Sequence, residues 1–150
     1  MTYAMLPRID RVAVVIVAAF VGLSAIVPGW TIMTSGTVGG YRLPADLLSR
    51  DAPFSDYLVP GLILLVVIGL GGVLTAAVNV ADARRGPFAA LAYGLVVVGW
   101  ILGELVLMTQ TMALTWVILG AGVVLVALAL PGVVRAVHGH ATGRNGEPAA

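Results

Sequence analysis

Four long apolar stretches restrict the folds open to this sequence more strongly than any other feature. They cover residues 12–33, 58–79, 88–108 and 112–134, and Glu104 is the one charged residue within them. A helix needs about 20 apolar residues to cross the hydrocarbon core of a bilayer. Only 10% of the residues are charged, against roughly 25% in soluble domains. This is too few to form a surface that faces water. The sequence therefore predicts an all-α membrane protein with four transmembrane helices.

Short connections predict that these stretches form one antiparallel four-helix bundle over residues 1–135. Residues 109–111 are the whole connection between the third and fourth stretches, and residues 82–87 connect the second and third. Pro87 suits the first turn of a helix, where its missing N–H costs little. Residues 136–150 contain many small and polar residues, and we predict that they form a disordered tail.

The connection between the first and second stretches is longer and covers residues 34–56. Its glycine-rich opening, residues 34–40, is predicted to be flexible. Within residues 43–48, three leucines share one helical face, which predicts a short helix on the outer membrane surface or over the bundle. Loops of this length often carry function, although packing on the solvent side is the more common role.

The arginines predict the direction of the spans, because loops rich in Arg and Lys face the cytoplasm. One side carries six arginines and the other carries two. The six are Arg8, Arg11, Arg84, Arg85, Arg135 and Arg144, and the two are Arg42 and Arg50. We therefore expect a multi-pass plasma-membrane protein whose N- and C-termini are both cytoplasmic.

A cleaved signal peptide is the alternative interpretation of the first stretch. Arg8 and Arg11 precede an apolar segment, and Gly22 and Ser24 form a loose cleavage pattern. However, Asp10 dilutes the positive flank, and apolar residues continue beyond the possible cleavage point. These two observations favour a retained transmembrane helix.

Glu104 is the candidate functional residue, because intramembrane acids are costly and often functional. No basic residue lies within any of the four stretches, and burial disfavours the charged form of a carboxyl group. We therefore predict that Glu104 is largely neutral and faces the interior of the bundle. Counted from the outer ends, Ser24 is the hydroxyl at the best-matched depth, and Trp100 lies one turn from Glu104 on the same helical face.

This site is compatible with two functions. In the first, Glu104 is neutral interhelical glue that hydrogen-bonds to Ser24 or to a backbone carbonyl in a structural or accessory component of the membrane. In the second, Glu104 couples protons or cations in a small transporter, and a homodimer is one form that this transporter can take. Enzyme activity is not expected, because the spans contain one acid and no histidine. We predict no catalytic residue and no cofactor, and His138 and His140 lack the further ligands that a metal site requires.

Pairs of small residues four positions apart predict where helices approach closely in lipid. Such pairs occur at Ala18 and Gly22, at Gly72 and Ala76, and at Gly99 and Gly103. They favour a compact bundle, or contact through Gly99 and Gly103 with a membrane-protein partner or a second copy. A nucleic-acid partner is not expected, because the net charge is +1 and no clustered basic face is present.

Two segments carry a resemblance to known proteins. They are PFSDYLVPGLILL, residues 53–65, and GWILGELVLMTQTMALTW, residues 99–116, with an Arg-Arg turn between them. This order resembles a group of small four-helix membrane proteins of actinobacteria over about residues 10 to 135. The resemblance implies the fold and the topology, and it assigns no activity or catalytic residue.

Overall fold

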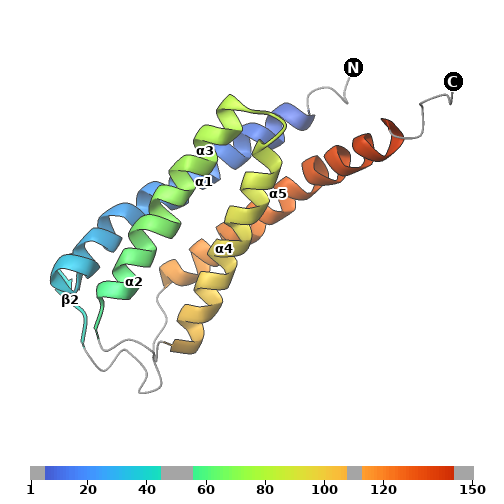
Figure 1. The fold of residues 1–150 in the computed structure, drawn as a ribbon. Coiled ribbons are helices and arrows are strands. Elements are labelled where there is room, and N and C mark those ends of the chain that lie inside the picture. The colour runs from blue at the N-terminus through green and yellow to red at the C-terminus, as the bar shows by residue number, and fades with distance from the viewer. Residues whose placement is uncertain (1–5, 45–55, 108–112, 144–150) are drawn as a thin grey trace, which may run out of the picture.

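The computed structural model describes residues 6–44, 56–107 and 113–143, and these ranges are almost entirely helical (Figure 1). The elements are α1 (Leu6–Ser35), β1 (Thr37–Val38), β2 (Tyr41–Arg42), α2 (Leu58–Ile63), η3 (Leu64–Leu70), α3 (Gly71–Ala81), α4 (Gly86–Leu107) and α5 (Ala113–Gly143). The segments α2, η3 and α3 follow one another without a break, and η3 is a π-helical segment. Four helices of membrane-spanning length result.

All four helices are apolar enough to cross a membrane, as predicted. In the most apolar window of each, at most 33% of the residues are buried inside the protein. Many large apolar side chains therefore point outward. Water-soluble proteins rarely expose an apolar surface of this size. Figure 1 shows the start of α1 and the α3–α4 turn at one end of the molecule, and the two short strands at the other.

The core contains many small residues, and the helix backbones come very close together where α1 meets the second span. On α1 the buried positions Val14, Ala18, Val21 and Ala25 recur with helical spacing. Gly22 approaches so closely that an added Cβ would lie 2.7 Å from the carbonyl oxygen of Gly69. Backbone-to-backbone contact of this kind requires glycine, which explains the small pairs in the first and second spans.

The helices α4 and α5 pack against each other through glycines other than the predicted pair, Gly99 and Gly103. A Cβ on Gly94 would lie 2.9 Å from Cγ2 of Val126, and one on Gly122 would lie 3.0 Å from Val97. By contrast, a Cβ built on Gly99 or Gly103 would have no described atom of a neighbouring helix within 4 Å. The Cβ positions of the predicted small pair on α4 therefore do not lie against a neighbouring helix of the described chain.

Two parts of the structure differ from the sequence-based prediction. Residues 37–42 form an antiparallel hairpin rather than a flexible segment, because Gly39 and Gly40 adopt the positive φ angles (56° and 84°) of a tight hairpin turn. The predicted tail at residues 136–150 is helical as far as Gly143, since extending an existing helix costs little. Of the predicted surface helix, Leu43 is not helical, and residues 45–48 lie outside the described ranges.

Candidate functional site

Glu104 lies near the end of α4 and is half-buried between α4 and α5. The hydroxyl of Thr115, a residue only 5% exposed, donates a hydrogen bond to its Oε1 over 3.3 Å. The two residues are nearly equidistant from the predicted turn at residues 109–111, as the geometry of a helical hairpin requires. Within the described ranges Glu104 has no ion pair, so a neutral hydroxyl is its partner.

Ser24 is not the hydrogen-bond partner of Glu104, which corrects the prediction. Its Oγ donates over 2.9 Å to the carbonyl oxygen of Val21 on its own helix. The physical reason lies in the packing: α1 lies mainly against the second span, whereas α4 lies mainly against α5. Matching the depth of two residues in the membrane does not bring them together when their helices have few contacts.

Ser24, Trp100 and Glu104 nevertheless line one cavity, together with Thr115. Its volume is about 130 Å³, and most of its remaining lining is apolar, including Ile68 and Ile101. A cavity of this size has room for several waters, provided that polar groups bind them. The site therefore brings three predicted residues together, and it adds one that the sequence analysis missed.

Trp100 adds an unusual polar group near this cavity. Among the described residues, its indole Nε1 is the one buried side-chain nitrogen or oxygen without a hydrogen-bond partner. A buried N–H without an acceptor costs free energy comparable to a lost hydrogen bond. This donor, the carboxyl group of Glu104 and the two hydroxyl groups are the polar chemistry of the site.

Polar groups at the opposite end of the molecule form a second cluster, which sequence analysis did not identify. Arg11 on α1 donates through Nε to the carbonyl oxygen of Asn79 and through Nη2 to that of Val80 over 2.6 Å. Asn79 is only 3% exposed, and its side chain donates over 2.9 Å to the carbonyl oxygen of Thr75. The signal in the sequence was the amide of Asn79 at the end of an apolar span.

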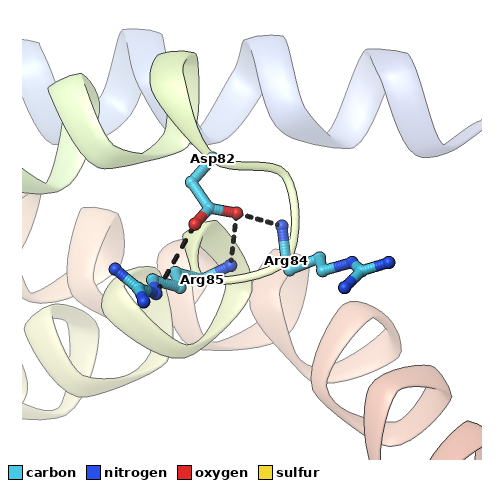
Figure 2. Close-up of polar contacts among 3 residues, drawn as sticks. All are labelled: Asp82, Arg84 and Arg85. Carbon is cyan, nitrogen blue, oxygen red and sulfur yellow. Dashed lines mark hydrogen bonds and ion pairs between the residues drawn. The ribbon is translucent and has the colours of Figure 1, made fainter.

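Asp82 organises the turn between α3 and α4 (Figure 2). Its Oδ1 accepts hydrogen bonds from the backbone N–H groups of Arg84, at 2.8 Å, and Arg85, at 3.2 Å. These bonds lower the pKa of the Asp82 carboxyl below its usual value. Its Oδ2 also lies 3.5 Å from Nε of Arg85. The carboxylate thus serves the start of α4, where Pro87 occupies the first turn as predicted.

The described ranges contain no group of three or more His, Cys, Asp or Glu residues that could hold a metal ion. His138 lies on α5, where its Nδ1 is 2.9 Å from the carbonyl oxygen of Val134. The side chain of His140 is not among those that the structure describes. His138 does not line the cavity beside Glu104.

Comparisons with protein-family profiles, curated proteins and solved structures find no match to this chain. The resemblance to small actinobacterial membrane proteins therefore stays a prediction, and the functional argument depends on the geometry of the chain alone.

Proposed function

We propose that this chain is a structural or accessory protein of the plasma membrane that acts by binding another membrane helix. In this proposal the four spans form an antiparallel bundle with both termini in the cytoplasm. The apolar outward surface of the four helices supports membrane insertion. The distribution of arginines along the chain supports the orientation.

One observation carries the proposal: the small pair on α4 faces open space. In the described chain, Gly22, Gly72, Gly94 and Gly122 all lie against a neighbouring helix, where a Cβ would be crowded. Gly99 and Gly103 lie on α4 with no described atom near such a Cβ. Glycines four residues apart let a second helix approach the backbone closely, so this face is suited to an intermolecular contact.

We propose a second copy of the chain as the occupant of this face. A two-fold symmetric contact needs only one patch, because the same residues meet across the axis. The stripe formed by Val96, Gly99, Gly103 and Val106 follows the spacing of one helical face. Val106 is 80% exposed, the largest value among the exposed apolar residues of α4. Pairing two α4 helices along this stripe would cover these side chains.

Disulfide crosslinking tests this contact without background, because the chain contains no cysteine. Val106→Cys is expected to give an oxidised homodimer in native membranes, since this position lies on the stripe next to Gly103. Adding Gly99→Leu and Gly103→Leu should reduce the crosslinked fraction by about tenfold, because leucine keeps the two backbones apart. The measurement is the ratio of dimer to monomer on a non-reducing gel.

Val27→Cys is the matched control for crosslinking. Val27 is 67% exposed on α1, a helix with few contacts to α4, so this variant should stay monomeric. Equal crosslinking at both positions would indicate random collision and would contradict the proposal. A crosslinked product that contains a different protein would identify that protein, rather than a second copy, as the occupant of this face. A purely monomeric Val106→Cys would exclude both occupants.

A second candidate function is proton-coupled or cation-coupled transport through Glu104. The observation that favours it is the cavity of about 130 Å³, in which Glu104 meets polar groups of α1, α4 and α5. Under this hypothesis, Glu104→Gln abolishes proton flux in proteoliposomes, since an amide cannot release a proton, while the helix content stays unchanged. Thr115→Val is the control, because it removes the hydrogen bond and keeps the carboxyl group. If Glu104→Gln leaves the flux intact, the coupling role is wrong.

A further inference from the structure

A basic hollow lies at the end of the molecule where α3 turns into α4. It has a volume of about 700 Å³ and lies between this turn and α5. Arg84 and Arg85 line it from the turn, and Arg135 lines it from α5, whereas no acidic side chain contributes to its lining. Three arginines from two elements thus contribute to the lining of one space that is large enough for a molecule to enter.

These guanidinium groups retain most of their hydrogen-bond donors. Each guanidinium has five N–H donors. Arg135 uses Nε to donate to the carbonyl oxygen of Pro131 over 3.1 Å, and this bond holds the group against α5. Arg84 makes no side-chain hydrogen bond or ion pair with the described part of the chain, and Figure 2 shows its guanidinium extending away from Asp82.

Asp82 does not neutralise the hollow. Its carboxylate is occupied by the backbone N–H groups of Arg84 and Arg85 and by the side chain of Arg85. Asp82 brings one negative charge beside three positive charges. Asp10 and Arg11, which line an adjoining cavity with Arg135, add one charge of each sign, so the excess stays positive. An anion with several acceptor oxygens would satisfy donors that otherwise only water can reach.

The apolar part of the lining distinguishes an amphiphile from a free anion. Phe88, which is 45% exposed, lines the same hollow and lies in the first turn of the candidate membrane span of α4. On the other side α5 closes against the turn, since a Cβ on Gly132 would lie 2.8 Å from the ring of Pro87. If α4 and α5 cross a bilayer, these arginines come to the level of the lipid headgroups, and Phe88 comes to the border of the acyl region.

We infer that this hollow binds the phosphate headgroup of one anionic phospholipid from the adjacent leaflet. Arg84 and Arg135 hold the phosphate oxygens through paired N–H donors, and an acyl chain lies along Phe88. The inference requires that the four helices span a bilayer. It does not depend on self-association through α4 or on the orientation of the chain, so the crosslinking experiment and the lipid experiment can fail independently.

Lipid binding to the full-length chain tests this inference. The protein is purified in a mild detergent, titrated with phosphatidylglycerol or phosphatidylcholine, and examined by native mass spectrometry. We expect one tightly bound phosphatidylglycerol per chain and at least about tenfold weaker binding of phosphatidylcholine, because two arginines favour a net negative headgroup. Arg84→Gln and Arg135→Gln should each weaken phosphatidylglycerol binding several-fold.

Arg42→Gln is the matched control, because it removes the same charge from β2 at the opposite end of the molecule. It should leave phosphatidylglycerol binding unchanged, and Arg135→Lys should restore only part of the loss, since ammonium lacks the planar fork. Far-UV circular dichroism verifies that each variant is folded. Equal binding of both lipids, or equal losses in Arg42→Gln and Arg135→Gln, would overturn the inference. Displacement of the lipid by millimolar inorganic phosphate would identify a free-phosphate site instead and would also overturn it.

Discussion

Gly72→Ala is expected to destabilise the protein by about 2 kcal/mol, because it places a methyl group where two helix backbones touch. A Cβ at this position would lie 2.7 Å from the carbonyl oxygen of Ala18 and 2.7 Å from Cα of Gly22. It would also lie 2.5 Å from the hydroxyl of Tyr93, which donates to the carbonyl oxygen of Ile68 in the π-helical segment. Neither backbone can yield without separating α1 from α3.

The measurement is the free energy of unfolding in mixed detergent micelles, followed by far-UV circular dichroism. Gly120→Ala is the matched control, since a Cβ built at this position would have no described atom of a neighbouring helix within 4 Å. It should leave stability unchanged or raise it by up to about 1 kcal/mol, because alanine is the better helix former. Similar effects of the two substitutions would show that helix propensity, rather than crowding between α1 and α3, controls the stability.

Arg11→Met is expected to destabilise the protein by about 2 kcal/mol, since it removes two charge-assisted hydrogen bonds. The acceptors are the carbonyl oxygens of Asn79 and Val80, which belong to the last turn of α3. Carbonyl groups in that turn have no partner within their own helix. Arg11 therefore connects the start of α1 to the end of α3, and the loss should be visible in the same unfolding measurement.

The control for Arg11→Met is Arg42→Met, which removes the same charge from an exposed position. The side chain of Arg42 forms no hydrogen bond or ion pair with the described residues, so little change is expected. Arg11→Lys should recover only part of the stability, because a single ammonium is less suited than a guanidinium fork to two carbonyl groups. A loss of equal size in Arg42→Met would contradict a specific role for the bonds to α3.

The partner of Glu104 shows how far sequence reasoning reached in the candidate site. Glu104 and Trp100 were correctly expected on one helical face, because helical spacing is a local property. Ser24 was expected as the partner from its depth alone, whereas Thr115 forms the hydrogen bond. The symmetry of the hairpin about residues 109–111 could have identified Thr115 from the sequence. The missing information was that α1, which carries Ser24, has few contacts with α4.

Other features had at most a weak signal in the sequence. The π-helical segment over residues 64–70 has the same apolar composition as the α-helical residues around it. The bonds from Arg11 to the end of α3 join residues that are 68 and 69 positions apart. The hairpin at residues 37–42 had a usable signal in its Gly-Gly pair, which we interpreted as flexibility.

The sequence by itself determined that the chain has four helices of membrane-spanning length, with Glu104 as the one acid within the predicted spans. These properties are local: a bilayer of about 30 Å selects the length of each apolar stretch, and lipid excludes unpaired backbone. Only the tertiary structure decided which faces meet. Lipid solvates every apolar face about equally well, so close backbone approach at Gly22 and Gly72 selects the α1–α3 contact and leaves Gly99 and Gly103 open.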